Sequence, residues 1–266
     1  MSTQRPRGRP PKFPPEEVRR RLLDAARESL KIDGVESGLD AVTLDGAIVD
    51  ADVPRGMAYK IWQDDDQTPQ DAFRRSVVVD LLSIPATAGL PATRELTGTY
   101  FEEHRETFEN GSVEDRRALL REAMRLIGGS NYNSLADSGN WKLYAALRTA
   151  AVTRPKVDPA LMNVLLAGEQ YLIEQYCSLY QDILTVFDLR LRDGLTLELF
   201  AAAAYALNEG LAQRVTETPS RTGLMLNEPQ GTSKEWTLFS IAFEGIVDRF
   251  FEFVDPDGQT HRILPG

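Results

Sequence analysis

The side chains best suited to chemistry lie at the start of the chain, where four cations occur without an acid. The segment is Gln4-Arg5-Pro6-Arg7-Gly8-Arg9-Pro10-Pro11-Lys12. Prolines and glycine prevent a helix here and favour an extended, narrow chain. Because Gly8 has no side chain, its backbone can reach the floor of a DNA minor groove while Arg7 and Arg9 spread along it. A·T-rich minor grooves are narrow and strongly negative, so we predict that the arm binds there through Arg5, Arg7, Gly8, Arg9 and Lys12.

The core of this arm, Pro6-Arg7-Gly8-Arg9-Pro10, resembles the AT-hook motif at all five positions. The resemblance implies a flexible arm over residues 1–13 that contacts DNA. The alternative is a disordered tail that only improves solubility. We keep both interpretations open at this stage.

The distribution of charge supports a DNA-facing N-terminus, although the whole chain has a net charge of −10. Residues 1–62 carry 11 Lys and Arg against 10 Asp and Glu, whereas the remaining 204 residues carry 19 against 30. A basic arm attached to an acidic body is expected when only one end of a protein contacts the phosphates of DNA.

Three short helices are predicted to position the residues that follow the arm. The first begins near Pro14 and Pro15, and has an apolar residue at every fourth position: Val18, Leu22, Ala26 and Leu30. The second begins at Thr43, and the third runs from Arg55 to Trp62 after Pro54. Two short helices joined by a tight turn form a helix-turn-helix, whose second helix can enter a major groove.

This stretch resembles the DNA-binding domain of the TetR family over about residues 16–82. The matching positions are Leu23-Asp24-Ala25-Ala26, Gly34, Val42-Thr43, Ile48, Ala51, Val53, Gly56, Tyr59 and Trp62. The resemblance implies an all-α protein, with a DNA-binding domain over residues 14–67 and a helical ligand-binding and dimerisation domain over residues 68–266. It also implies a bacterial transcriptional regulator that acts as a homodimer, as a repressor released by a small-molecule effector.

The resemblance carries DNA-binding roles to seven further residues. Thr43 and Tyr59 match positions that contact phosphate, and Met57 and Lys60 match positions that face the groove. Pro54 and Arg55 open the recognition helix, and Gly56 allows close approach. The alternative for Met57 and Tyr59 is that they are core residues of a small helical unit. Two departures from the family pattern stand out: Asp52, which can adopt the turn geometry, and the acidic segment Asp64–Asp66, which would repel DNA.

The rest of the chain is predicted to be a bundle of helices with few strands. Expected helices span residues 91–110, then residues 112 to about 128, 134–151, and about 158–187. Thr68 precedes the predicted start of an earlier helix, and Ser112 marks the predicted start of the second helix named above. A turn at Asp255-Pro256-Asp257-Gly258 is expected to support a small hairpin.

Two sets of residues in this region have candidate roles in binding. One set lines two late helical faces and is expected to form the dimer interface, as Leu199, Ala203, Ala206, Gly210, Trp236, Phe239, Phe243, Val247 and Phe250. The other set is aromatic and is expected to line an effector pocket, as Trp141, Tyr144, Tyr171, Tyr176 and Tyr180. For both sets the alternative is ordinary packing inside one subunit.

Several classes of function lack their sequence signals. The two histidines and single cysteine, Cys177, show no metal-ligand spacing, and no phosphate-binding or nucleophile motif occurs. We therefore expect a protein that is not an enzyme, uses no cofactor, and binds no membrane, because no apolar run reaches about 18 residues. DNA as a partner implies a cytoplasmic, nucleoid-associated location. The alternatives are a nonspecific architectural protein for A·T-rich DNA and a helical ligand-binding or partner-binding protein without DNA recognition.

Overall fold

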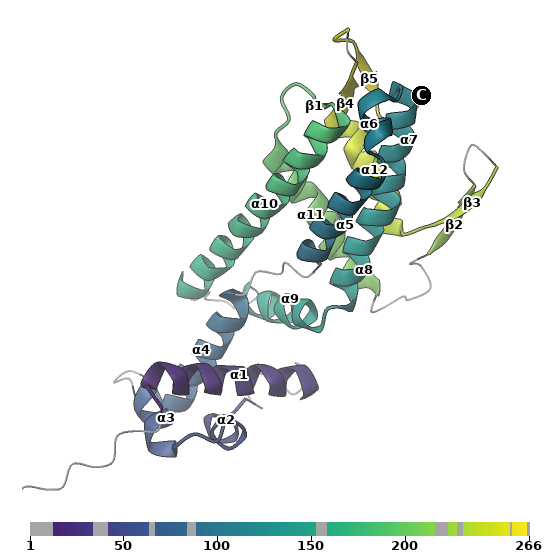
Figure 1. Cartoon of the computed structure of the whole chain (residues 1–266). Coiled ribbons are helices and arrows are strands. Elements are labelled where there is room, and N and C mark those ends of the chain that lie inside the picture. Colours follow the sequence, from purple (N-terminus) through teal and green to yellow (C-terminus); the bar gives the residue numbers. More distant parts are fainter. Residues whose placement is uncertain are drawn as a thin grey trace, which may run out of the picture. The chain divides into compact units, whose positions relative to one another are not determined.

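The computed structural model describes residues 13–33, 42–63, 67–83, 89–152, 159–215, 223–227, 231–255 and 257–264. Helices dominate these residues, which confirms the predicted all-α class, and a few short strands accompany them (Figure 1). The chain divides into two compact units. Unit 1 is Met1–Ile84 with Leu143–Leu165, and unit 2 is Pro85–Lys142 with Leu166–Gly266.

Some predicted features lie outside the described residues. These are Arg5, Arg7, Gly8, Arg9 and Lys12 of the arm, the helix-ending Gly34, and Asp64–Asp66. No helix within the described ranges is both long enough and apolar enough to cross a membrane.

Unit 1 includes α1 (Pro15–Asp33), α2 (Leu44–Asp50), α3 (Arg55–Ile61) and α4 (Pro69–Ser83). The predicted starts of α1, α2 and α3 are confirmed to within a residue. The predicted apolar stripe of α1 is buried, with each side chain at most 3% exposed, as Val18, Leu22, Ala26 and Leu30. Burial of such a stripe removes apolar surface from water and fixes α1 as the support for α2 and α3.

Helix α4 packs within unit 1, although the sequence analysis groups it with the larger domain. The rings of Trp62 and Phe73 meet edge to face with centroids 4.9 Å apart, and Trp62 Nε1 donates a hydrogen bond to Ser76 Oγ at 2.9 Å. The Gln70 side chain accepts from the Leu44 N–H at 2.7 Å and donates to the Val42 carbonyl at 2.9 Å. Helix α4 therefore holds the first turn of α2 in place.

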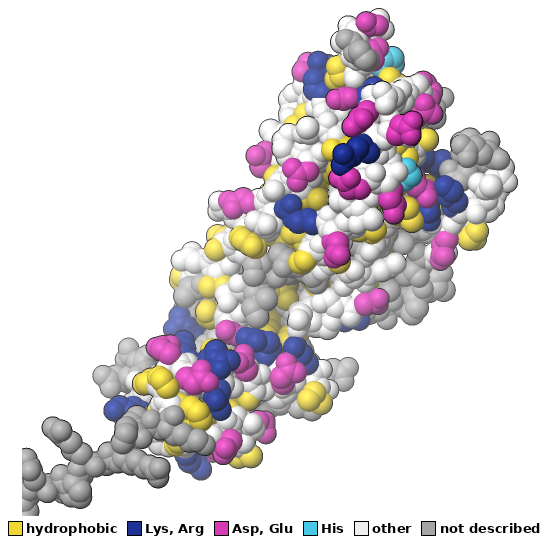
Figure 2. Space-filling model, viewed as in Figure 1, with side chains coloured by type: hydrophobic (Ala, Val, Ile, Leu, Met, Phe, Trp, Pro, Cys, Tyr) yellow, Lys and Arg dark blue, Asp and Glu magenta, His cyan; other side chains and the backbone are white. Residues whose placement is uncertain are grey.

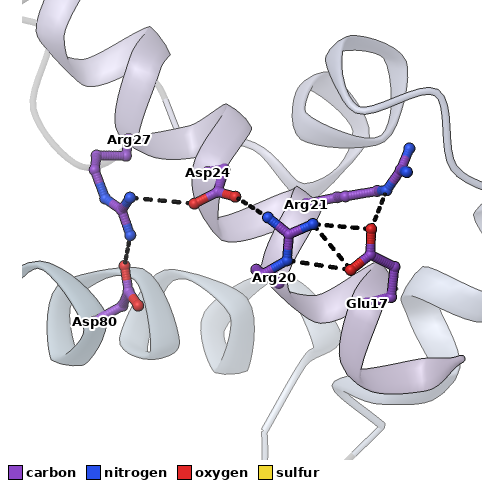
Figure 3. A network of polar contacts seen from close by, with 6 residues as sticks. All are labelled: Glu17, Arg20, Arg21, Asp24, Arg27 and Asp80. Atoms are coloured by element: carbon purple, nitrogen blue, oxygen red, sulfur yellow. Dashed lines mark hydrogen bonds and ion pairs between the residues drawn. The ribbon is translucent and has the colours of Figure 1, made fainter.

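Ion pairs also join α1 to α4 (Figure 3). The Arg27 guanidinium donates to Asp80 on α4 at 2.6 Å and to Asp24 on its own helix at 3.1 Å. The pairs continue along α1 through Arg20, which bridges Asp24 and Glu17. Because Arg27 and Asp80 are both about three-quarters buried, this contact is the best shielded of the network and holds the two helices in register.

The helices that belong wholly or in part to unit 2 are α5 (Leu90–Glu103), α6 (Arg105–Asn110), α7 (Val113–Ala123), α8 (Gly129–Asp137), α9 (Gly139–Val152), α10 (Pro159–Phe187), α11 (Leu197–Val215) and α12 (Leu238–Phe250). A π-helical turn, Met124–Gly128, connects α7 directly to α8. Residues 143–165, from α9 and the start of α10, belong to unit 1.

The predicted helix boundaries in this region are partly wrong. The helix expected over residues 91–110 is divided at His104, and the one expected over 134–151 is divided at Ser138. The start after Ser112 is confirmed by a capping box with Asp115, and α10 ends at Phe187 as predicted.

The expected stop at Gly128 and Gly129 is wrong, because the helical chain continues through both glycines. A Cβ atom at Gly128 would lie 3.4 Å from the Phe239 ring, and one at Gly129 would lie 3.4 Å from Thr237 and Ser240. A Cβ atom at either position would therefore make ordinary van der Waals contact with the start of α12. Ser240 Oγ also donates to the Arg125 carbonyl at 3.4 Å, within the π turn.

Two small antiparallel sheets accompany the helices of unit 2. One has the order β1 (Leu189–Leu191), β4 (Phe251–Val254), β5 (Thr260–Arg262), and the other pairs β2 (Leu224–Asn227) with β3 (Ser233–Trp236). The β4–β5 hairpin confirms the predicted turn: Asp255 Oδ1 accepts hydrogen bonds from the Asp257 and Gln259 N–H groups. Strand β1 and the β2–β3 hairpin were not predicted.

Candidate nucleic-acid interface

The helix-turn-helix of unit 1 is built from α2, a four-residue turn and α3. Helix α2 begins at Thr43, whose Oγ1 accepts a hydrogen bond from the Gly46 N–H at 3.0 Å. The turn passes through Asp52, which has a φ of 49°. Aspartate adopts this left-handed conformation more readily than most residues, which confirms that the turn tolerates Asp52 in place of glycine. Buried Val53 and Ala58 then attach the turn and α3 to the core.

The outer surface of this motif holds most of the predicted DNA-binding residues. Thr43, Pro54, Arg55, Gly56 and Lys60 are exposed. No atom lies within 4 Å of a Cβ built on Gly56, so this position leaves open space beside the start of α3.

Met57 and Tyr59 are only partly exposed, so part of each side chain supports the core and part faces solvent. Trp62, at 4% exposure, anchors the end of α3 in the core.

Asp45 on α2 holds two of the candidate DNA-binding side chains of α3. The Arg55 guanidinium donates to Asp45 Oδ2 at 3.0 Å, and the Tyr59 hydroxyl donates to Asp45 Oδ1 at 3.0 Å. The Tyr59 hydrogen bond and the nearby Asp45 charge raise the pKa of Arg55, so its positive charge is secure. In this arrangement both side chains point at a carboxylate, and they must leave it to contact a phosphate or a base.

The charge of this surface is mixed. Between Thr43 and Trp62, Asp45, Asp50 and Asp52 outnumber the cations Arg55 and Lys60. Figure 2 likewise shows acidic and basic side chains interspersed on the face in view. The helix-turn-helix therefore offers a shape that fits a major groove but little net attraction for phosphate of its own.

A cavity lies inside unit 2. Its lining comes from α5, α7, the π turn, α8, α10, β1, α11, α12 and β4, and consists of Thr93, Leu120, Ala123, Met124, Ile127, Gly128, Asn131, Leu179, Tyr180, Ile183, Leu184, Leu189, Phe200, Phe239, Phe243, Val247 and Phe251. The centre of a water molecule can reach about 70 Å³ of this space. None of the lining residues is an aspartate, glutamate, lysine, arginine or histidine.

The five aromatic residues predicted for an effector pocket take different positions. Tyr180 lines the cavity. Tyr176 is buried beside Tyr180, and its hydroxyl accepts a hydrogen bond from Asn131 Nδ2 at 3.2 Å. Trp141 is buried at 3% exposure, Tyr144 is buried and belongs to unit 1, and Tyr171 is 46% exposed. Most of the cavity lining was missed because leucine, isoleucine and phenylalanine at helical spacing indicate a core as readily as a pocket.

The residues predicted for dimerisation divide into an exposed and a buried group. On α11, Leu199 is 54% exposed, Ala206 and Gly210 are exposed, and Ala203 is partly exposed. The other group is largely internal: Trp236, Phe239, Phe243 and Val247 are buried, and Phe250 is partly buried. Trp236 lies on β3, before α12 begins, and not on the helix as the sequence analysis expected.

Ring packing explains why the aromatic face of α12 is internal. Phe200 of α11 lies at the centre of the cluster, with its ring centroid 5.7 Å from Phe243, 5.4 Å from Phe250 and 4.6 Å from Phe251. These contacts fill the space between α11 and α12 within one chain. The surface of α11 that remains open is the one that carries Leu199, Ala206 and Gly210.

Within the described ranges no group of three or more His, Cys, Asp or Glu side chains could hold a metal ion. Cys177 is partly buried, and burial raises the pKa of its thiol, which disfavours the reactive thiolate.

The comparisons with known proteins add one solved structure. No protein-family model matches the chain, and no curated protein matches it. The chain is similar to the crystal structure of a candidate TetR-family transcriptional regulator from Rhodococcus sp., at 18% identity, with 75% of this chain and 87% of that chain covered and a TM-score of 0.36. A superposition this loose carries no role from that protein to this chain.

Proposed function

We propose that the protein is a sequence-specific DNA-binding transcriptional regulator. The observation that carries the proposal is the helix-turn-helix of unit 1, with the Thr43-capped α2, the turn at Asp52, and an α3 that exposes Arg55, Gly56 and Lys60. A helix of this kind, anchored on one side by buried residues and open on the other, fits a major groove.

The arm supplies the attraction that the helix-turn-helix lacks. Residues 13–62 carry 7 Lys and Arg against 10 Asp and Glu, and the first twelve residues add four cations and no acid. Arg5, Arg7, Arg9 and Lys12 therefore reverse the sign of the DNA-facing region. In the proposal, Arg7 and Arg9 occupy an A·T-rich minor groove beside the major groove that α3 enters.

The proposed regulator acts as a homodimer and as a repressor. The open surface of α11, with Leu199, Ala206 and Gly210, supports a contact between two copies, because small residues allow helices to approach closely. Two copies present two recognition helices to two half-sites, which raises affinity over that of one short helix. An effector bound in unit 2 favours a spacing of the two recognition helices that does not match the two half-sites. The protein then releases the DNA.

The test begins with selection of genomic fragments that the full-length protein retains, followed by fluorescence anisotropy on the recovered duplex. We expect Lys60→Ala to weaken binding by about 10-fold, within the range for loss of a groove contact. Lys142→Ala is the matched control, because Lys142 is an exposed helical lysine of unit 2 and should leave affinity unchanged. Sedimentation velocity on the complex measures whether two copies bind each site.

The same assay tests the arm. Arg7→Ala combined with Arg9→Ala is expected to weaken binding several-fold and to reduce the slope of log affinity against log salt concentration. Unchanged affinity and slope would remove the arm from the proposal. Equal binding to the selected site and to random A·T-rich duplex would instead indicate an architectural protein, and failure to retain any fragment would indicate a protein without DNA recognition.

A further inference from the structure

The cavity of unit 2 is formed around an irregular piece of helix. The π turn Met124–Gly128 supplies Met124, Ile127 and Gly128 to the lining. A π turn is less favourable than regular α-helix, and such turns occur frequently at functional sites. The turn therefore forms part of the cavity wall, together with residues of α10, α11 and α12.

The polar groups of the lining are few, and two are already engaged. The Thr93 hydroxyl donates to the Gly89 carbonyl at 2.8 Å, and the Asn131 amide lies within hydrogen-bond distance of the Tyr176 hydroxyl. For the Tyr180 hydroxyl, the described residues provide no hydrogen-bond partner. Burial raises the pKa of Tyr180 well above its usual range, so the hydroxyl stays protonated and can donate. A ligand that accepts a hydrogen bond from this hydroxyl would gain the free energy of one neutral hydrogen bond.

The size of the cavity limits the ligand. One water needs on the order of 10–15 Å³ of space for its centre, so about 70 Å³ accommodates roughly five waters. At about 30 Å³ of liquid volume per water, this corresponds to roughly 150 Å³. That volume suits a molecule with one aromatic ring, because a cavity of about this size holds benzene. The Phe200, Phe239 and Phe243 rings offer faces and edges against which such a ring can pack.

We propose that this cavity binds an uncharged, largely apolar molecule of one ring that carries one hydrogen-bond acceptor, to which the Tyr180 hydroxyl donates. A carboxylate or ammonium group is disfavoured, because no ionised side chain lines the cavity and an unpaired buried charge is costly. The role of this molecule as an effector rests on the proposed function, but its binding does not.

Equilibrium dialysis of the full-length protein against three substituted benzenes tests the proposal. The probes are acetophenone, which has an acceptor, ethylbenzene, which has nearly the same shape without one, and benzoate, which is an anion. We expect acetophenone to bind about 3- to 10-fold more tightly than ethylbenzene, the gain of one neutral hydrogen bond. We expect benzoate to bind at least about 100-fold more weakly than acetophenone.

Two variants and one control assign the binding to this cavity. Tyr180→Phe keeps the ring and removes the hydroxyl, so it should bring the ratio of the two neutral affinities close to one. Tyr132→Phe is the matched control: Tyr132 is buried and stacks on Phe239, but it does not line the cavity, and its variant should keep the wild-type ratio. Ala123→Leu fills part of the lining and should weaken both neutral probes, with folding checked by circular dichroism.

The outcomes separate the cavity from the proposed function. Absence of binding by either neutral probe, equal binding of benzoate, or a ratio that survives Tyr180→Phe would each overturn the ligand class. Dialysis contains no DNA, so these results do not depend on the helix-turn-helix. Binding as predicted by a protein that retains no DNA would support the cavity and contradict the proposed regulator.

Discussion

Removal of the Asp45 charge should strengthen DNA binding and hardly change folding. Asp45 accepts hydrogen bonds from Arg55 and Tyr59, at 3.0 Å each, on the surface of the helix-turn-helix. Both partners in the ion pair are more than half exposed, with 68% of the Arg55 side chain and 53% of the Asp45 side chain accessible. Exposed pairs of this kind contribute about 0.2–1 kcal/mol at most. The free energy of unfolding of Asp45→Asn should therefore fall by less than about 1 kcal/mol.

The small free energy of the Arg55–Asp45 ion pair, which favours folding, opposes DNA binding. Arg55 must leave Asp45 before it can contact DNA, and Asp45→Asn removes that cost of about 0.2–1 kcal/mol per subunit. This corresponds to a gain of up to about 5-fold in affinity per subunit, and up to about 25-fold for two copies on one site. A freed arginine that neutralises an additional phosphate should also steepen the salt dependence by about 0.9 per subunit.

Fluorescence anisotropy with the selected duplex, from 50 to 300 mM KCl, measures both quantities. Asp50→Asn is the matched control, because Asp50 is exposed on the same helix and has no ion-pair partner within the part of the chain that the structure describes. It removes the same charge without releasing Arg55, so its gain should be clearly smaller. If Asp45→Asn binds no more tightly than Asp50→Asn while both remain folded, Asp45 does not restrain Arg55 and the reasoning fails.

Two further predictions concern stability. Asp52 has a φ of 49°, so Asp52→Gly should be at least as stable as the natural chain, whereas Asp52→Ala should lose about 1 kcal/mol in urea denaturation; an equally stable alanine variant would contradict the strained turn. Hydrogen bonds from Arg125 and Lys234 lower the pKa of Glu122 from 4.5 to about 2, so the stabilisation by this carboxylate is complete above pH 4.5 and is lost as the pH falls toward 2. Glu122→Gln should flatten the loss of stability in that range, whereas Glu95→Gln, at an exposed position, should keep it; equal slopes for the two variants would refute the assignment.

The parts of the fold that the sequence could predict are those set by local chemistry. Thr43 and Ser112 cap helices because their hydroxyls accept from backbone N–H groups three residues on, which requires no distant partner. The four-residue spacing of apolar residues on α1 also indicates a buried stripe, because this pattern can be recognised within one helix. The turn at Asp255 is equally local, since its carboxylate binds two N–H groups within four residues.

The parts that could not be predicted depend on residues far away in the chain. A pair of glycines often ends a helix, but here the chain continues through Gly128 and Gly129 from the π turn into α8, where it packs against Thr237 and Phe239. Strand β1 exists because β4, more than 50 residues later, pairs with it. Phe200 and Phe243 have the spacing of any apolar helical face, so only the fold shows that both line a cavity.

The restraint of Arg55 by Asp45 could not be predicted from the helix pattern either. It requires α2 and α3 to meet at the observed angle, and that angle depends on the left-handed Asp52 between them. The residue types at the candidate interface were foreseen, but their partners in the absence of DNA were not.

The π turn also determines where the length of this chain can change. A π turn absorbs one extra residue without rotating the helix that follows it. Deletion of Leu126, which is 39% exposed, would convert the turn to regular α-helix and leave Tyr132 and Leu135 of α8 facing the core. Deletion of one residue within α7 or α8 would instead rotate the remaining helix by about 100° and turn that face toward solvent. The segment Met124–Gly128 is therefore the point in the run from Val113 to Asp137 where deletion of one residue preserves the helical phase.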